Sequence, residues 1–160
     1  MNIAIILSGG VGTRMGVDRP KQYIEIGSKP IISYCIDTFV HHGRIDKFII
    51  VVADEWLDYV YNEVKDVKLP IYYAKPGDTR QFSIFNALLV AEQEGCDSDD
   101  IVIVHDAVRP LVSNSIIDQC IDGICEGFDG VMPVISVKDT IYQSQDQLTI
   151  SKLLNRKELF

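Results

Sequence analysis

Short, continuous apolar runs recur along this chain and are separated by segments with helical periodicity. Each run lacks the alternation of a half-exposed strand, which is typical of strands covered on both faces of a parallel sheet. Strands that alternate with helices predict an α/β fold with a doubly wound sheet. The predicted strands are Ile3–Leu7, Phe48–Val52, Pro70–Tyr73, Ile101–Val104 and Val131–Ile135.

Four apolar stripes with a spacing of three and four residues predict the helices, and they begin near Ile32, Leu57, Ile84 and Ile117. Residues 136–153 break this rhythm, because two short β-type runs flank a turn rich in Gln, Ser and Asp. We expect the runs, Thr140–Tyr142 and Leu148–Ile150, to form a protruding β-arm. The chain stops within a patterned stretch, so we expect residues 1–160 to be most of a single, longer domain.

The charge balance restricts the partners. Fifteen Lys and Arg against twenty-three Asp and Glu give a net charge of −8, which argues against broad binding of nucleic acid or anionic membranes. The four cysteines form no C-x-x-C pair and have no histidine at zinc spacing, and the chain begins without a basic leader. We therefore expect a reduced, cytoplasmic protein with no dedicated metal-ligating residues.

The chemistry-bearing residues follow the predicted strands. The carboxyl ends of parallel strands share one edge, where α/β proteins bind ligands. The segments that follow those ends are Ser8–Gly16 with Lys21, Gly77–Ser83, His105–Pro110 and Lys138–Thr140. We expect a small cationic pocket at this edge of an acidic body.

The glycine-rich segment after the first strand indicates phosphate binding, because glycines allow the backbone to approach an anion closely. It is neither a Walker A motif nor a dinucleotide fingerprint, since Met15 stands where the latter needs Gly or Ala. Arg14 and Lys21 beside the loop suit a triphosphate whose charge grows during transfer. The alternative is a simple glycine turn with two solvated cations.

The two later loops leave alternatives open. Gly77–Ser83 is typical of a helix N-terminus, capped by Asp78 or Thr79. Arg80 in a first turn opposes the helix dipole, so a nearby anion would explain it. Asp106 could hold Mg²⁺ or accept from a hydroxyl and Arg109 could bind a phosphate, or the two could form only a local ion pair.

These segments resemble the polyol-phosphate cytidylyltransferases. The matching blocks, in family order, are Leu7–Gly16 with Pro20–Tyr23, Gly77–Leu88, His105–Pro110, Val137–Thr140 and Asn155–Leu159. The resemblance spans the whole chain. It implies a Rossmann-like nucleotidyltransferase sheet, CTP as co-substrate, Mg²⁺ as cofactor, and a homodimer formed through the arm at 136–153.

The resemblance also implies a role for each matching residue. Catalysis would depend on Arg14, Lys21 and Asp106. The nucleotide would be bound by Ser8, Gly9, Gly10, Gly12, Gly77, Asp78, Arg80, Ser83 and Ala107. The polyol phosphate would be bound by Arg109, Thr140 and Arg156, with Asp106 beside them.

The acceptor is less sharply indicated. Val137–Ile141 favours 2-C-methyl-D-erythritol 4-phosphate, and hence isoprenoid precursor synthesis, which is our first expectation. Ser8-Gly9 and Val108 favour the alternative, ribitol 5-phosphate. A CTP-binding module without catalysis is a hypothesis of another class, and a nicotinamide-dependent oxidoreductase is weakened by the missing fingerprint.

Overall fold

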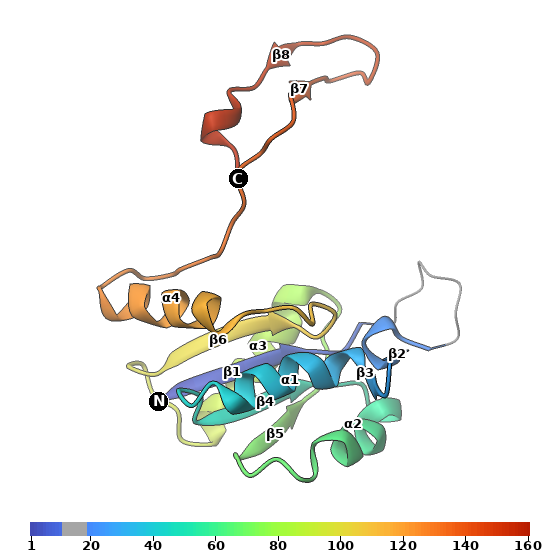
Figure 1. The fold of residues 1–160 in the computed structure, drawn as a ribbon, viewed down its shortest axis with the longest axis vertical. Coiled ribbons are helices and arrows are strands. Elements are labelled where there is room, and N and C mark those ends of the chain that lie inside the picture. Colours follow the sequence, from blue (N-terminus) through green and yellow to red (C-terminus); the bar gives the residue numbers. More distant parts are fainter. Residues whose placement is uncertain (11–18) are drawn as a thin grey trace.

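The structure, a computed structural model, describes residues 1–10 and 19–160. Within these residues, four parallel strands form the central sheet in the order β5-β4-β1-β6 (Figure 1). The strands are β1 (Asn2–Leu7), β4 (Lys47–Val51), β5 (Ile71–Ala74) and β6 (Ile101–Asp106). Their last residues pair across the sheet, Leu7 with Val51 and Asp106, and Val51 with Ala74. The predicted parallel α/β sheet is confirmed, and its carboxyl ends share one edge.

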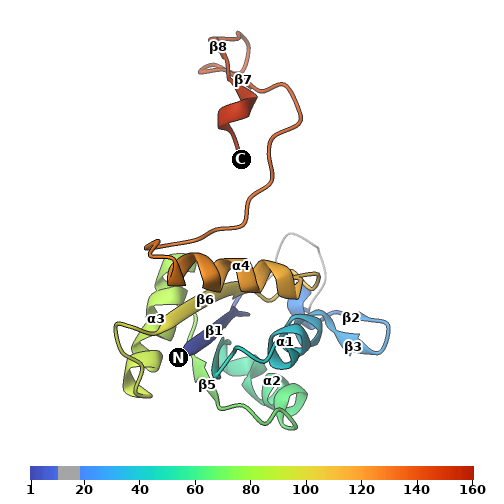
Figure 2. The same ribbon diagram turned by 60° about the vertical axis from the view of Figure 1, so that its left-hand side comes forward.

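Helices cover both faces of the sheet (Figure 2). They are α1 (Ile31–His41), α2 (Leu57–Val64), α3 (Arg80–Gln93) and α4 (Asn114–Cys125). Ile3 and Ile5 of β1 are buried with Ala87 and Ala91 of α3. The alternate residues Ala4 and Ile6 are buried on the other face, where the core is completed by Ile32 and Phe39 of α1, Val60 of α2 and Ile117 of α4. Because successive side chains of β1 point to opposite faces, the strand is buried on both, as its continuous apolar run predicted.

α2 begins at Leu57, as its apolar stripe predicted, and Asp54 does not cap it. Asp54 begins a 3-10 turn, Asp54–Trp56, that precedes α2. Its carboxylate pairs instead with Lys75, with 2.8 Å between Oδ2 and Nζ. The side chain lies too early in the chain to reach the free N–H groups of the helix.

The predicted fifth strand, Val131–Ile135, is wrong. The segment forms no strand, and Met132 and Ile135 are 76% and 87% exposed. Val131 packs against α4 at Gly123 instead of pairing beside β6, and Pro133 has no N–H to donate to a neighbouring strand. Consequently Lys138 and Thr140 do not follow a strand end and do not reach the edge of the sheet.

Residues 136–160 extend away from the sheet and carry a short hairpin (Figure 1). Its antiparallel strands are β7 (Tyr142–Gln143) and β8 (Lys152–Leu153). The second strand lies later than the predicted Leu148–Ile150, because the Asp146 carboxylate accepts hydrogen bonds from the backbone N–H groups of Leu148 and Thr149 and holds them in the turn. Whether this hairpin is a dimer arm stays a prediction. A second small hairpin, β2 (Glu25–Ile26) and β3 (Lys29–Pro30), precedes α1.

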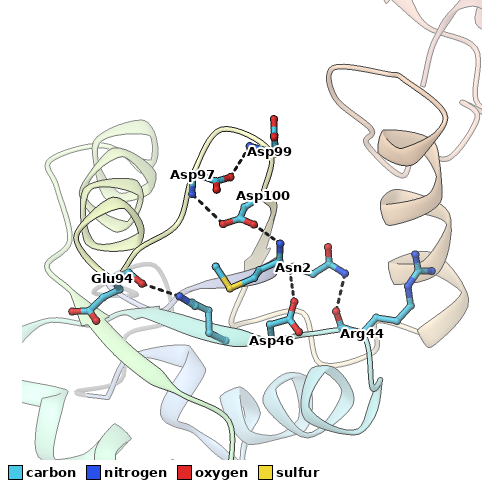
Figure 3. A network of polar contacts seen from close by, with 9 residues as sticks. Asn2, Arg44, Asp46, Glu94, Asp97, Asp99 and Asp100 are labelled. Carbon is cyan, nitrogen blue, oxygen red and sulfur yellow. Dashed lines mark hydrogen bonds and ion pairs between the residues drawn. The ribbon is translucent and has the colours of Figure 1, made fainter.

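The amino-terminal edge of the sheet is closed by internal hydrogen bonds (Figure 3). The backbone N–H of Asn2 donates to Asp46 (2.6 Å), and its side-chain amide donates to the Arg44 carbonyl (2.8 Å). Asp97 and Asp100 order the loop before β6, since each carboxylate accepts a backbone N–H within it. Within the described residues, no helix is long and apolar enough to cross a membrane. The polar groups of this edge are used in hydrogen bonds to one another, whereas the predicted site residues lie at the carboxyl edge.

Candidate functional site

An open cavity of about 510 Å³ lies at the carboxyl ends of β1, β4 and β6. We call it the sheet-edge cavity. The predicted site residues that line it are Gly9, Gly10, Gly77, Asp78, Arg80, Ser83 and Asp106. Leu7, Gln22, Val51, Pro76, Thr79 and Val108 complete its wall. Three loops distant in sequence therefore meet here, as the shared strand edge predicted.

Hydrogen bonds of Ser8 hold the turn after β1 in place. Ser8 is 2% exposed and its N–H donates to the Val51 carbonyl at 2.9 Å, so it continues the parallel ladder. The Ser8 side chain lies under the cavity, where its hydroxyl is 2.6 Å from the Tyr23 hydroxyl. Gly9 and Gly10 then pass along the cavity wall. Backbone N–H groups at such a turn can bind a phosphate.

The N-terminus of α3 forms the opposite wall. Thr79 is its cap and accepts a hydrogen bond from the Phe82 N–H at 3.2 Å. The Ser83 hydroxyl accepts from the Gly77 N–H and donates to the Thr79 carbonyl, both at 3.0 Å. These bonds hold the loop against the helix. Gly77 and Ser83 therefore form a rigid wall of the cavity, and the exposed Asp78 carboxylate lies beside them.

Asp106, the last residue of β6, lies between two arginines. Its Oδ1 accepts from Arg80 Nη2 at 3.1 Å, and its Oδ2 accepts from Arg109 Nε at 3.0 Å. Burial opposes ionisation of this carboxyl, but the hydrogen bonds from Arg109 and Arg80 outweigh it and hold its pKa below the ordinary value. Asp106 thus supplies the anion that explains Arg80 in the first turn of α3. The local pair of Asp106 with Arg109 does form. Arg80 also donates through Nε at 3.3 Å, so Nη1 of Arg80 and both Nη groups of Arg109 have no partner among the described residues.

His105 orients the turn that carries Arg109. Its Nε2–H donates to the Arg109 carbonyl at 2.9 Å. Burial lowers the pKa of the imidazole, which favours the neutral ring at neutral pH. This hydrogen bond ties the end of β6 to the turn that follows it.

Other predicted site residues lie elsewhere. Ala107 is fully buried in the hydrophobic core with Ile32 and Ile117, so it does not line the cavity. Lys21 is half-buried and directly precedes Gln22, a wall residue. Thr140 and Arg156 line a separate cavity beside the hairpin, where Arg156 donates to the Lys138 carbonyl at 3.0 Å. Gly12 and Arg14 lie outside the described residues.

Sequence reasoning missed Gln22, although it lies in the Pro20–Tyr23 block that was quoted for the resemblance. Its side chain is 4% exposed and hydrogen-bonds to the turn after β1. The available signal in the sequence was its position between Lys21 and Tyr23 in that block. Only the fold shows that this amide reaches a loop more than ten positions earlier.

The close contact between Gly9 and Pro76 in this wall can be tested by substitution. A Cβ at Gly9 would lie 2.5 Å from Pro76 Cβ and 3.1 Å from its Cγ. We expect Gly9→Ala to lower the free energy of unfolding by about 1–3 kcal/mol, the usual cost of overpacking. Chemical denaturation measures the change.

The matched controls identify Pro76 as the cause. Pro76→Gly removes the Cβ and should restore most of the stability in the double variant, apart from the flexibility that a new glycine adds. Pro76→Ala keeps the Cβ and should not restore it. Equal rescue by both replacements would show that the strain arises elsewhere.

The described residues of the cavity offer few protein ligands for a divalent cation. Within residues 1–10 and 19–160, no group of three or more His, Cys, Asp or Glu is placed to hold a metal ion. Mg²⁺ usually takes one or two protein carboxylates together with substrate phosphates and water. Asp106 is the recessed carboxylate of the cavity that fits this requirement, and both of its oxygens accept from arginines.

Comparison with known proteins relates this geometry to a family. The model of the family IspD, 2-C-methyl-D-erythritol 4-phosphate cytidylyltransferase, matches residues 2–160. A ribitol-5-phosphate cytidylyltransferase from Streptococcus agalactiae is 39% identical over all of this chain and 67% of its own length. Another, from Lacticaseibacillus paracasei, is 32% identical over 99% of this chain and 68% of its own.

A solved structure has the same fold. The 4-diphosphocytidyl-2C-methyl-D-erythritol synthase from Anaerococcus prevotii superimposes with a TM-score of 0.81 at 24% sequence identity. The match covers 98% of this chain and 65% of that one. The chain thus spans about two thirds of the length of the proteins it matches.

Proposed function

Because the chain belongs to the 2-C-methyl-D-erythritol 4-phosphate cytidylyltransferase family, we propose that it transfers CMP from CTP to a small polyol phosphate, with ribitol 5-phosphate as the acceptor. One observation carries this proposal: a glycine turn, a helix N-terminus and the Arg80–Asp106–Arg109 cluster meet at one cavity. Turn and helix amides bind anions, and guanidinium groups bind phosphate oxygens.

The acceptor assignment revises our first expectation. Sequence reasoning placed 2-C-methyl-D-erythritol 4-phosphate first and ribitol 5-phosphate second. The relatives from Streptococcus agalactiae and Lacticaseibacillus paracasei, at 39% and 32% identity, are named for ribitol 5-phosphate. Their similarity over almost the whole chain supports the second acceptor better than the first. The product would then be CDP-ribitol.

The proposed reaction exchanges one phosphorus–oxygen bond for another. A phosphate oxygen of the acceptor attacks the α-phosphorus of CTP, and the bond from that phosphorus to the β-phosphate oxygen breaks, so pyrophosphate leaves. The turn at Gly9 and Gly10 binds the triphosphate. Lys21 and Arg14 stabilise the charge of the transition state, and Arg109 holds the acceptor phosphate.

We further propose that the reaction uses Mg²⁺ and that the enzyme acts as a cytoplasmic homodimer. Mg²⁺ would be held by Asp106 and the phosphates of CTP, and when bound it supplies positive charge to the phosphoryl oxygens. Thr140 and Arg156 lie on the extended 136–160 segment, apart from the sheet-edge cavity of their own chain (Figure 1). Delivery to the cavity of a second copy would give them the predicted role in binding the acceptor.

Pyrophosphate release tests the proposal directly. With CTP and Mg²⁺, we expect kcat/KM for ribitol 5-phosphate to exceed that for 2-C-methyl-D-erythritol 4-phosphate by on the order of tenfold or more, since one mispaired polar group costs at least that. Turnover of the erythritol phosphate alone would restore the first expectation. CTP binding without pyrophosphate from either acceptor would favour a non-catalytic binding module.

A further inference from the structure

The Gln22 side chain closes the underside of the phosphate-binding turn. Gln22 belongs to the 3-10 turn Lys21–Tyr23 and is 4% exposed. Its Nε2 donates to the Ser8 carbonyl at 2.6 Å and to the Gly10 carbonyl at 2.8 Å. A primary amide has two N–H groups, so both are used on this one turn.

Tyr23, the next residue, strengthens the same attachment. Its hydroxyl donates to the Ser8 carbonyl at 3.1 Å and lies 2.6 Å from the Ser8 hydroxyl. The tyrosine is fully buried, and its ring stacks on Trp56 with 4.7 Å between centroids. Burial raises the pKa of the Tyr23 hydroxyl, so it remains a donor at neutral pH. The turn therefore rests on a rigid support.

The attachment determines which way the turn presents its amide. In a planar trans peptide, the carbonyl of one residue and the N–H of the next point in opposite directions. When the Ser8 carbonyl faces Gln22, the Gly9 N–H must face away from it. Gly9 lines the sheet-edge cavity, and no described residue accepts a hydrogen bond from its N–H.

We propose that Gln22 is a positioning residue for nucleotidyl transfer. Its amide holds the Ser8–Gly10 turn in the orientation that binds the triphosphate, and it fixes Lys21, its neighbour in the chain, to the same turn. The inference rests on the function proposed above. It assigns to the Gln22 amide the relative placement of the phosphate-binding turn and the catalytic lysine.

The chemistry of the side chain excludes near substitutes. Methionine has a similar length and shape but no donor, so it leaves the Gly10 carbonyl without its partner. Glutamate would place a carboxylate against two carbonyl oxygens, which repels both and adds negative charge beside the triphosphate. The binding of CTP should therefore weaken from Gln to Met to Glu.

Calorimetric titration of CTP and of cytidine separates positioning from general instability. For Gln22→Met, we expect CTP to bind about tenfold more weakly, the usual effect of losing a hydrogen bond of this kind. Cytidine, which has no phosphate, should bind as it does to the wild type. At saturating CTP, kcat should fall on the order of tenfold to 100-fold, because Lys21 shifts with the turn.

A control variant and the contrary outcomes separate the positioning role of Gln22 from the proposed function. Gln93→Met, at the exposed end of α3, should change neither ligand. Gln22→Asn keeps a neutral amide that is one methylene too short to reach both carbonyls, and it provides the same test if Gln22→Met does not fold. Equal losses for CTP and cytidine, or no loss, would overturn the positioning role while the wild type still turns over. A wild type that binds no CTP would instead overturn the proposed function.

Discussion

Replacing Lys21 with methionine should lower kcat by about 10²- to 10³-fold, the usual effect of removing one preorganised group that stabilises transition-state charge. The lysine follows the glycine turn in the motif and directly precedes Gln22, which is hydrogen-bonded to that turn. The charge on the phosphates increases and shifts toward the pyrophosphate as the bond breaks. A cation held beside them acts on the transition state more than on bound CTP, so KM for CTP should change far less than kcat.

The fold should tolerate this substitution. Across the described part of the chain, the Lys21 ammonium makes no hydrogen bond or ion pair, and the side chain is half-buried. Removing it breaks no hydrogen bond or ion pair to residues 1–10 or 19–160, so the midpoint of thermal unfolding should stay near that of the wild type. A loss of activity with an unchanged midpoint assigns the effect to chemistry.

Lys75→Met is the matched control. Lys75 follows β5 at the same edge of the sheet, and its ammonium pairs with Asp54 at the surface, where both side chains are more than 70% exposed. The substitution removes one positive charge from the same edge without touching the phosphate turn. Turnover should change by less than about twofold, as expected for an exposed charge screened by salt. Unchanged turnover in Lys21→Met would refute the transition-state role.

The parts of the site that the sequence predicted depend on local patterns. The run at Ile3–Leu7 is continuous because β1 is buried on both faces, and the run at Ile101–Val104 belongs to β6, the half-buried strand beside it. Once these strands are parallel, the segments after them must meet at one edge. This is why the sequence alone predicts that Gly9, Gly77 and Asp106 lie at one edge of the sheet.

The parts that the sequence did not predict depend on partners distant in the chain. Val131–Ile135 has the composition of a strand, but Val131 packs against Gly123 of α4 and Pro133 has no N–H to donate, so the segment does not pair with β6 at the end of the sheet. Gln22 looks like an ordinary polar residue until the fold places it beneath Ser8 and Gly10. Likewise, the anion that pairs with Arg80 is a carboxylate of another loop, Asp106.

Asp106→Asn should lower kcat/KM for the polyol phosphate by about 100-fold, the effect expected when a positioned group shifts by roughly an ångström. The native carboxylate accepts from Arg80 on one oxygen and from Arg109 on the other. An asparagine can accept through only one atom, and its amide N–H groups would face the second guanidinium. One arginine would be released from the cluster, and the cluster would lose the charge proposed to hold Mg²⁺.

Stability should respond much less. Arg80 and Arg109 are 56% and 74% exposed, and each such pair contributes on the order of 1 kcal/mol or less. Because the folded pKa of Asp106 is lowered, its contribution is present above the pKa of the unfolded chain and is lost as the pH falls through the folded value. The difference in unfolding midpoint between wild type and Asp106→Asn should therefore shrink as the pH falls below about 4.

Asp54→Asn separates this effect from the general loss of a surface ion pair, because Asp54 pairs with Lys75 outside the cavity. It should leave kcat/KM unchanged. If Asp106→Asn also left kcat/KM unchanged, the Asp106–Arg109 contact would be only a local ion pair. If kcat/KM fell while the binding of CTP was retained, the carboxylate would act on the acceptor side of the reaction. That outcome is expected when CTP is titrated without Mg²⁺, because Arg109 lies on the exposed turn beyond β6, where the acceptor phosphate can reach guanidinium nitrogens that no described residue contacts.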